Sequence, residues 1–469
     1  IAATPHLQVI GRAGRGVDNI DVAAATSRGI AVLNTPDANA TTTAELTLAH
    51  ILSLSRNLPQ ADRSVKAGEW KRSLFMGTEL SNKVLGIIGY GTIGRIVAAT
   101  ALALNMEVRV YDPFVTEEKL QADGVGAQEL DALLADADYV TLHCPVTEDT
   151  RHILNADRLR LMKPGVRLIN CARGGLIDET VLYELLKSGH IAGAALDVYE
   201  TEPPAESPLL ELDNVVLTPH LGASTREAQT AAGIGIARQV ATYLQTGEPV
   251  NAINLPAVSA EEARHLRVYL LLSSCLGRLL AAMVPGPISR FEVSLWGEAT
   301  QRDGKSIATE ALVGLLGSHM SMPVNRVNAG LIGEQQGMQL SETHYDEHPD
   351  YHTAVGLTVH HGDTTTTVMG TLFDRKHPRL VRINNYEIEA FLSGHLLLSR
   401  HFDQPGVIAA ISTLLAENQI NIARMQLGIV ADSDKAVALI EVSQPLEQDV
   451  MDKLLQVKAI VDVAQVSMS

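Results

Sequence analysis

The sequence is poor in cysteine and aromatic residues. Its three cysteines, Cys144, Cys171 and Cys275, are scattered and form no CxxC pair. An odd and sparse set of thiols argues against a disulfide framework and is typical of a reducing compartment. We therefore expect a cytoplasmic protein.

Basic residues are also scarce relative to acidic ones. Lys and Arg total 37 while Asp and Glu total 54, which gives a formal net charge of −17. Because nucleic acid is bound through clustered Lys and Arg, this balance argues against a nucleic-acid partner. It does not argue against a small anionic substrate, which needs only a local basic pocket.

Long apolar runs are missing as well. No segment reaches the roughly 18 consecutive apolar residues of a membrane-spanning helix, so we expect no membrane partner. No signal peptide is visible, but the chain opens at Ile1, without Met, in a pattern that already indicates a helix end followed by a strand. We expect the natural N-terminus to lie upstream.

What the sequence does have is an alternation of apolar strands with helices. With 469 residues it is too long for one core, and we expect three or four structural units. Short α/β units are predicted over 7–37, and a long helix over about 223–245. Between them, apolar strands are predicted at 84–91, 108–112, 137–145, 166–173, 193–199 and 214–220. This alternation predicts a parallel, doubly wound sheet covered on both faces, an α/β fold.

Local signals refine this picture at two places. Thr42 and Glu45 have the spacing of a capping box before an apolar helix. That helix, 41–57, is too apolar to face water alone, which predicts a homo-oligomer. The stretch at 331–337, within GLIGEQQG, we interpret as a turn without a ligand.

The C-terminal half has a different texture. After a linker-like stretch at 251–259, residues 260–392 mix a long helix with extended segments, which predicts an α+β domain. Residues 394–469 follow the order strand, helix, strand, strand, helix, strand. This order is typical of a ferredoxin-like fold.

A dinucleotide site is predicted at VLGIIGYGTIG, residues 84–94. Gly89, Gly91 and Gly94 form GxGxxG between a strand and a helix, and Asp112 ends the next strand. Gly89 permits the tight turn, Gly91 admits the pyrophosphate and Gly94 allows close helix packing. Asp112 would accept hydrogen bonds from the ribose hydroxyls and repel a 2′-phosphate, which predicts NAD rather than NADP. The alternative is an ordinary Gly-rich turn.

Three charged or titratable residues follow successive strands: Arg173, Glu202 and His220. The carboxyl ends of such strands line the ligand crevice, so the three can converge on a nicotinamide pocket. Histidine has an unperturbed pKa of about 6.5, which suits a base that takes a proton from a secondary alcohol. Glu202 would orient the ring, and Arg173 would hold an α-carboxylate and polarise the reacting oxygen.

Each of these residues taken alone has a simpler interpretation. A histidine at a strand end is usually structural, and Glu202 could be a solvated turn acid. Asp197 is either structural or close to the nicotinamide amide. Only the joint arrangement favours catalysis.

The motifs together resemble a known family. GYGTIG with Asp112, CARGGLID, ETEPP and TPHLGAST are closely similar to the D-isomer-specific 2-hydroxyacid dehydrogenases over about residues 9–255. Within that family, GRAGRGVDNID, NTPDANATTTAELT, GEWKRSLFMGTEL and the long C-terminal extension resemble the branch that oxidises D-3-phosphoglycerate at the start of L-serine biosynthesis.

The resemblance implies both an organisation and a set of contacts. It implies a Rossmann NAD-binding domain (38–222) inserted in a flavodoxin-like substrate domain (1–37 and 223–254), which is incomplete at its N-terminus. An intervening domain (255–392) and an ACT domain (393–469) follow. It supports Arg173, Glu202 and His220 as the catalytic trio. The substrate contacts it implies are Arg12, Asn39 and Arg173; the NAD contacts are Thr92, Ile93, Asp112, Cys144, Cys171, Arg173, Asp197, His220 and Gly222. Arg15 departs from the small residue common in the family.

The C-terminal resemblance implies regulation. In HFDQPGVIAAISTLLAENQINIARMQ, Pro405 is expected to start a helix whose N-terminus attracts an amino-acid carboxylate. Asp403 could take the ammonium and Asn421 could bridge, while His401 falls at a ligand-facing family position. L-Serine is the implied effector; the alternative is a unit used only for dimerisation. The basic cluster Arg375, Lys376, Arg379 and Arg382 either binds an effector anion or forms a solvated edge.

The sequence leaves other functions open. A reductase of glyoxylate or hydroxypyruvate shares the site, but the ACT-like tail favours biosynthetic feedback. A non-catalytic NAD-sensing scaffold and a serine-sensing oligomer with a degraded site are further alternatives. The resemblance also suggests dimer contacts through the NAD domain and tetramer contacts through the tail.

Overall fold

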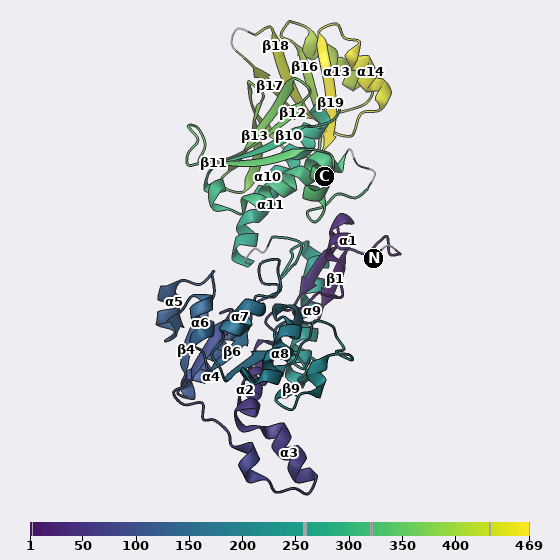
Figure 1. The fold of residues 1–469 in the computed structure, drawn as a ribbon. Helices are drawn as coiled ribbons and strands as arrows, with labels where there is room; N and C mark the ends of the chain where they lie inside the picture. Colours follow the sequence, from purple (N-terminus) through teal and green to yellow (C-terminus); the bar gives the residue numbers. More distant parts are fainter. Residues whose placement is uncertain (2, 257–259, 319, 321, 431–432, 469) are drawn as a thin grey trace. The chain divides into compact units, whose positions relative to one another are not determined.

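The computed structural model describes residues 1, 3–256, 260–318, 320, 322–430 and 433–468. The chain divides into two compact units (Figure 1). Unit 2 consists of residues 12–16 and 34–238, and unit 1 consists of residues 1–11, 17–33 and 239–469.

Unit 2 is built on a seven-stranded sheet in the order β5-β4-β3-β6-β7-β8-β9, and every pair in it is parallel. The strands are β3 (Val84–Ile88), β4 (Glu107–Tyr111), β5 (Gly126–Ala127), β6 (Tyr139–Leu142), β7 (Val166–Asn170), β8 (Ile191–Leu196) and β9 (Val215–Leu217). The order reverses between β3 and β6, where doubly wound sheets bind ligands at their carboxyl ends. The predicted Rossmann sheet is confirmed.

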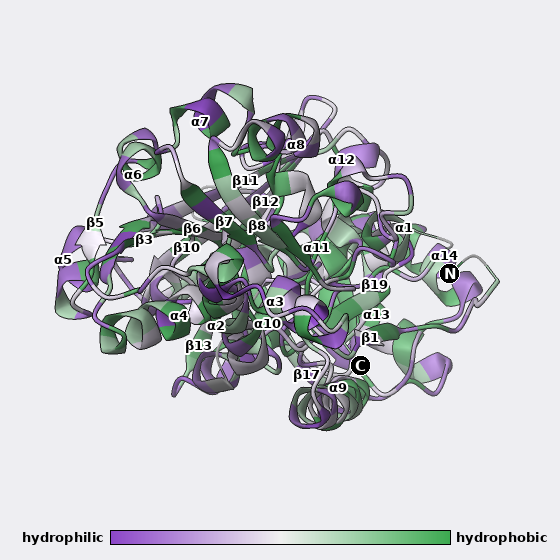
Figure 2. Cartoon of the chain, turned by 60° about the horizontal axis from the view of Figure 1, so that its bottom comes forward, coloured by the Kyte–Doolittle hydropathy of each residue, from purple (hydrophilic) through white to green (hydrophobic). Residues whose placement is uncertain are grey.

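Helices cover both faces of this sheet. They are α2 (Ala40–Arg56), α3 (Leu58–Lys66), α4 (Thr92–Ala103), α5 (Glu117–Ala122), α6 (Leu130–Asp136), α7 (Ala156–Leu161) and α8 (Glu179–Ser188), with short turns η1 (Arg72–Phe75), η2 (Gly174–Leu176) and η3 (Pro208–Glu211). One core lies against α6, α7 and α8, and a second lies against α2 and α4. The inner strands are therefore mostly apolar; β8 is entirely so, whereas β7 also contains Arg167 and Asn170, and Figure 2 shows the hydrophobic colour of both strands.

The N-terminal segment forms β1 (Val9–Arg12), α1 (Val22–Ser27) and β2 (Ala31–Asn34), and β1 pairs with β2. The long helix α9 (Arg226–Thr246) follows the parallel sheet in the sequence. These are the short α/β units and the long helix that the sequence predicts.

Unit 1 contains a six-stranded sheet in the order β11-β10-β12-β13-β14-β15, which is antiparallel except for the β10–β11 pair. Its elements are α10 (Ala260–Met283), β10 (Arg290–Gly297), η4 (Glu298–Gln301), α11 (Gly304–Gly317), α12 (Ala329–Gln335), β11 (Gln339–Tyr345), β12 (Thr353–His361), β13 (Thr364–Phe373), β14 (His377–Ile383) and β15 (Tyr386–Phe391). The apolar faces of α10 and α11 share one core with this sheet.

Helix α10 corrects one expectation. Over Glu261–Met283 it is long and apolar enough to meet the length and composition criteria for a membrane span, the one such helix in the described part of the chain. Sequence reasoning passed over it because Arg267 and Arg278 interrupt the apolar run. Leu272 and Leu276 are fully buried in the core of unit 1, so the role of α10 within the fold accounts for its composition.

A second, four-stranded antiparallel sheet of unit 1 has the order β17-β18-β16-β19. Its elements are β16 (His395–Phe402), α13 (Val407–Glu417), β17 (Ile422–Ile429), β18 (Lys435–Val442), α14 (Gln448–Leu455) and β19 (Ile460–Ser467). This is the predicted ferredoxin-like arrangement. One face of the sheet packs against α13 and α14, and residues of the other face, such as Leu398 and Leu439, belong to the core shared with α10.

Three local predictions are wrong. Thr42 does not cap a helix, because α2 already begins at Ala40, after Asn39; the Thr42 hydroxyl instead lies 3.0 Å from that of Thr225. The stretch interpreted as a turn at 331–337 lies mostly in α12, whose Ile332 packs into the core. Pro405 does not start α13, which begins two residues later at Val407.

The reason given for an oligomer also changes. Helix α2 does not present its apolar face to water, since Ala44, Ile51 and Leu54 are buried inside unit 2. Apart from Leu52 of α2, which is 42% exposed, the exposed large apolar residues of this region lie further along the chain, between residues 58 and 76.

Candidate active site

The Gly-rich turn joins β3 to α4 with little spare space on one side. Gly89 has a φ of +96°, and a Cβ there would lie 2.8 Å from the Cys144 nitrogen. A Cβ on Gly94 would lie 2.3 Å from the Gly89 carbonyl oxygen. Both positions therefore require glycine, which brings the N-terminus of α4 against the end of β3.

The other side of the turn is open. A Cβ on Gly91 would meet nothing within 4 Å, and no side chain caps the N-terminus of α4. The uncapped backbone N–H groups of this first turn can receive a phosphate. Residue geometry thus fits the dinucleotide pyrophosphate that the motif predicts.

Asp112 lies directly after β4 and is fixed beside the Gly-rich turn. Its Oδ2 accepts a hydrogen bond from the Tyr90 backbone N–H at 2.7 Å, and its Oδ1 accepts one from that of Phe114 at 2.9 Å. The carboxylate is held at the position where the ribose of a dinucleotide is recognised in this fold. Its negative charge fits NAD and opposes a 2′-phosphate.

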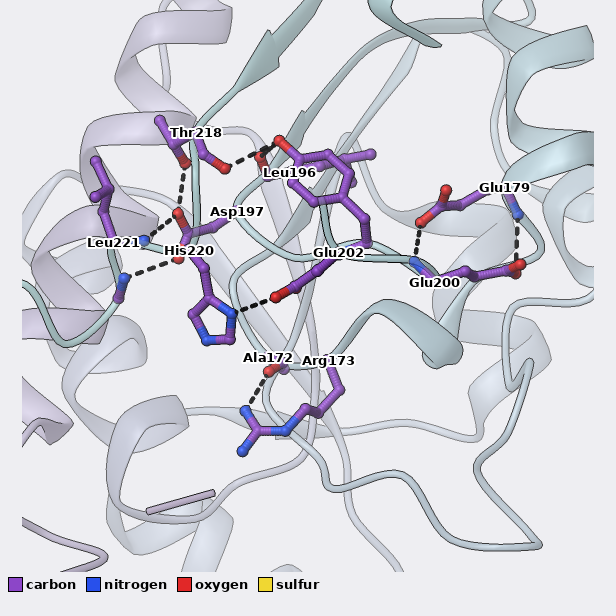
Figure 3. Close-up of polar contacts among 12 residues, drawn as sticks. Ala172, Arg173, Glu179, Leu196, Asp197, Glu200, Glu202, Thr218, His220 and Leu221 are labelled. Carbon is purple, nitrogen blue, oxygen red and sulfur yellow. Dashed lines mark hydrogen bonds and ion pairs between the residues drawn. The ribbon is translucent and has the colours of Figure 1, made fainter. Parts of the chain in front are cut away.

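Arg173 stands at the end of β7, before two glycines. Asn170 fixes its backbone by donating from Nδ2 to the Arg173 carbonyl at 2.8 Å, and Arg173 Nη1 donates to the Ala172 carbonyl at 2.7 Å. A Cβ on Gly174 would lie 1.9 Å from the Tyr199 carbonyl oxygen. Gly174 therefore lets the loop that carries Glu202 pass directly over the Arg173 turn (Figure 3).

Glu202 and His220 form a pair in this region. Nδ1 of His220 lies 2.8 Å from Oε2 of Glu202, and Oε1 of Glu202 accepts from the Tyr199 backbone N–H at 3.2 Å. Their side chains remain 49% and 39% exposed, so a small molecule can reach them. In Figure 3 the imidazole, Glu202 and Arg173 lie around one region of unit 2.

A buried carboxylate shapes the loop that carries His220. Asp197 is fully buried; its Oδ1 accepts from the Thr218 hydroxyl at 2.6 Å and from the Leu221 N–H at 2.7 Å, while Oδ2 accepts from the Gly222 N–H at 2.8 Å. The Asp197 carbonyl also accepts from the His220 N–H at 2.9 Å. These bonds stabilise His220 in its left-handed conformation, with a φ of +56°.

Other predicted cofactor residues lie around the turn. Burial raises the pKa of Cys144 to about 11 and that of Cys171 to about 12, so both remain neutral thiols at physiological pH. Thr92 Oγ1 lies 3.4 Å from Asp37 Oδ1, and Ile93 follows it in the first turn of α4.

The predicted substrate residues Arg12 and Asn39 both belong to unit 2. Nη1 of Arg12 donates to the Ala13 carbonyl. Asn39 precedes α2, and its Oδ1 is buried without a hydrogen-bond partner among the described residues. A buried acceptor without a partner favours a ligand that brings a donor.

The three predicted effector residues are not joined by any hydrogen bond among the described residues. His401 on β16 is buried, its Nδ1 has no described partner, and burial lowers its pKa. Asp403 is exposed, and the Asn421 N–H donates to Ser443 Oγ at 3.1 Å. In the basic cluster, Arg375 pairs with Glu298 and Arg379 stacks on Phe391.

Sequence reasoning missed the residues that support the site. His50 Nε2 lies 3.2 Å from Thr218 Oγ1, so it extends the hydrogen-bond chain from Asp197. Glu179 accepts from the Glu200 N–H at 2.6 Å and anchors the loop before Glu202. In the sequence, His50 has the position of a core residue in an apolar helix. Thr218 could have been identified, because it lies two residues before His220.

The Gly-rich turn, the acid after β4 and the His–Glu pair define a nucleotide-dependent dehydrogenase of Rossmann fold. Comparison with known families agrees. Residues 48–222 match the D-isomer specific 2-hydroxyacid dehydrogenase NAD binding domain, 265–384 match the D-3-phosphoglycerate dehydrogenase intervening domain, and 397–465 match an AHAS small subunit-like ACT domain. The chain belongs to the D-3-phosphoglycerate dehydrogenase family, and the cofactor of its dehydrogenase domain is NAD.

Individual relatives cover nearly the whole chain. D-3-phosphoglycerate dehydrogenase of Methanocaldococcus jannaschii is 40% identical over 100% of this chain and 89% of its own. The Bacillus subtilis protein of the same name is 39% identical over 97% and 87%. A crystal structure of D-lactate dehydrogenase from Aquifex aeolicus, complexed with NAD and lactic acid, is 33% identical with a TM-score of 0.50 and covers 55% of this chain and 83% of its own.

Proposed function

We propose that this chain oxidises D-3-phosphoglycerate to 3-phosphohydroxypyruvate with NAD, the first step of L-serine biosynthesis. The observation that carries the proposal is the 2.8 Å contact between His220 Nδ1 and Glu202 Oε2, which lies near Arg173 in Figure 3. The names of the full-length relatives supply the substrate.

The residues divide the chemistry between them. Glu202 binds Nδ1 of His220, which leaves Nε2 to take the proton of the substrate hydroxyl. The carboxylate of Glu202 favours the imidazolium that then forms. Arg173 binds the α-carboxylate and polarises the oxygen that becomes the carbonyl. NAD, when bound, supplies the hydride acceptor for the carbon that bears the reacting hydroxyl.

We propose that NAD is held by the residues around the Gly-rich turn. The N-terminus of α4 would hold the pyrophosphate, and Asp112 would hold the ribose hydroxyls. The full proposed set is Gly89, Gly91, Thr92, Ile93, Gly94, Asp112, Cys144, Cys171, Arg173, Asp197, His220 and Gly222. The open space at Gly91 and the uncapped N-terminus of α4 support the part of this set that would hold the pyrophosphate.

For the substrate we propose Arg12 and Asn39 in addition to Arg173. The buried, unpartnered Oδ1 of Asn39 supports a ligand donor at that position. Arg12 adds a positive charge suited to a substrate that has both a carboxylate and a phosphate.

We propose that the chain is a cytoplasmic homo-oligomer. The family resemblance suggests that this oligomer is a tetramer. The segment after α2 supports self-association, because Trp70 and Met76 are 80% and 84% exposed and Leu58, Val65 and Leu74 are more than half exposed. Figure 1 shows α3 and the residues after it projecting from unit 2. Burial of such an apolar arm against a second copy would remove it from water.

We also propose regulation by L-serine through the ACT domain (393–469), with His401, Asp403 and Asn421 as candidate contacts. For the rest of the chain we propose a substrate domain (1–37 and 223–254), an NAD domain (38–222) and an intervening domain (255–392). The matched ACT segment supports a small-molecule effector.

The test is a comparison of substrates with one preparation of the full chain. The proposal predicts NAD reduction with D-3-phosphoglycerate and a much lower kcat/KM for reduction of glyoxylate and hydroxypyruvate with NADH. It predicts a lower rate with L-serine, and restored rate in Asn421→Ala. A preference for glyoxylate or hydroxypyruvate would assign the reductase function instead, and NAD binding without any turnover would support a scaffold.

A further inference from the structure

Unit 1 contains a cavity of about 610 Å³ that is separate from the proposed effector residues. It lies between α10, α11 and the last strand, β19, which Figure 1 shows close together. Its polar lining includes Arg278, Ser274, Glu310, Ser318 and Gln465. A ligand in this cavity would touch α10 and α11 of the intervening domain and strand β19 of the ACT domain.

The two helices cannot move together to close this space. A Cβ on Gly277 would lie 2.1 Å from the Ala311 carbonyl oxygen, and a Cβ on Gly314 would lie 2.3 Å from that of Ser274. The backbones of α10 and α11 are therefore already in contact. The helices therefore cannot come closer to each other. Ala281, Ala282 and Gly317 line the cavity and are too small to fill it.

Opposite charges line the cavity. Arg278 lies on α10 and donates to the Ser467 carbonyl at 3.4 Å. Glu310 lies on α11, and its side chain is 20% exposed and 3.5 Å from Arg326. Burial raises the pKa of Glu310, while the charges of Arg326 and Arg278 and a hydrogen bond from Ser274 lower it. Arg278 and Glu310 thus both line the cavity, and they are close enough for their charges to interact.

We propose that this cavity binds an α-amino acid, with its carboxylate on Arg278 and its ammonium on Glu310. A guanidinium and a carboxylate on facing helices match the two charges of a zwitterion. The glycine and alanine residues of the lining leave space beside the two charges for the ligand's side chain. Such a ligand would fasten α10 and α11 to β19, and would thereby couple the intervening and ACT domains.

The experiment is isothermal titration calorimetry of the full chain with glycine, L-alanine, L-serine and L-lactate, without substrate. His401→Ala serves as the background, so that the proposed effector position does not contribute. We expect L-alanine to bind at least about tenfold more tightly than L-lactate, which lacks the ammonium. We expect Arg278→Gln and Glu310→Gln each to weaken L-alanine by at least about tenfold.

A cavity-filling variant provides a second test that does not alter the charges. A Cβ on Gly317 meets nothing within 4 Å, so Gly317→Leu fits the backbone and fills the cavity. Gly330→Leu on α12 is the matched control, because its Cβ is equally unobstructed and it does not line the cavity.

We expect binding to disappear in Gly317→Leu and to persist in Gly330→Leu. Absence of amino-acid binding at millimolar concentration would overturn the proposal, as would equal affinity for L-lactate or unchanged binding in Gly317→Leu. None of these readouts depends on dehydrogenase activity, so their failure leaves the proposed function untouched.

Discussion

Nδ1 of His220 lies 2.8 Å from Oε2 of Glu202, and the loop that brings Glu202 there passes over Gly174, next to Arg173. One structural arrangement thus connects the three residues proposed for catalysis. The proposed base, its proposed orienting acid and the proposed carboxylate-binding cation come from different strand ends. Their joint position depends on how the Tyr199–Glu202 loop packs.

Glu202→Gln should lower kcat by about 10–100-fold, because the amide keeps a hydrogen-bonding group but loses the charge that favours the imidazolium. KM for D-3-phosphoglycerate should change little. Glu206→Gln, an exposed acid in the same segment, is the control. An unchanged kcat in Glu202→Gln would show that the acid is only a turn residue.

Gly174→Ala should destabilise the fold by about 1–3 kcal/mol and reduce kcat, because its Cβ would lie 1.9 Å from the Tyr199 carbonyl oxygen. Gly175→Ala is the matched control, since the nearest atom to its Cβ lies 3.8 Å away. Urea unfolding and steady-state kinetics measure the two effects. Equal behaviour of the two variants would contradict the close loop contact.

Thr218→Val should destabilise the chain by about 1–3 kcal/mol, because it removes the 2.6 Å hydrogen bond to the buried carboxylate of Asp197. It should also lower kcat by disturbing the His220 loop. Thr246→Val, at an exposed position, should cost less than about 0.5 kcal/mol. Thermal unfolding of both variants tests the difference.

Asp112→Asn should relax the preference for NAD over NADP by about tenfold or more, because it removes the charge that repels a 2′-phosphate. The amide oxygen can still accept from the Tyr90 N–H, so the turn should persist. The measurement is the ratio of kcat/KM for the two cofactors. A ratio that stays at the wild-type value would mean that Asp112 does not face the ribose.

Glu179 should give the chain a pH-dependent stability. Burial raises its pKa above the ordinary 4.5, so the folded state holds this proton more tightly than the unfolded state. Its contribution is therefore present below the unfolded pKa and is lost as pH rises through the folded pKa. Glu179→Gln should flatten the stability curve in that window, whereas exposed Glu184→Gln should not. The measurement is the free energy of unfolding in urea between pH 4 and neutrality. If this free energy changes with pH equally in Glu179→Gln and in the native chain, the assignment is contradicted.

The fold was largely predictable because its signals are local. Apolar strands alternating with helices indicate the parallel sheet, and the order of elements after residue 393 indicates the ferredoxin-like sheet. The errors came from competition between local signals. Helix α2 begins directly after Asn39, so Thr42 lies inside the helix. The glycine-containing stretch around Ile332 is helical, because Ile332 packs into the core from this helix.

The candidate site was predictable where residues follow strands, and not where they meet through tertiary contacts. Arg173, Glu202 and His220 were identifiable from their positions, although their roles remain predictions. The contact of Gly174 with Tyr199 and the chain from His50 through Thr218 to Asp197 join segments far apart in the sequence. Sequence spacing carries no signal for such pairs.

The most direct test of the central claim is steady-state NADH formation from D-3-phosphoglycerate by the native chain and by His220→Ala. The account predicts turnover in the native chain and a loss of about 10²–10⁴-fold in kcat in the variant, with NAD affinity retained. Turnover that persists in His220→Ala would contradict the assignment of His220 as the base.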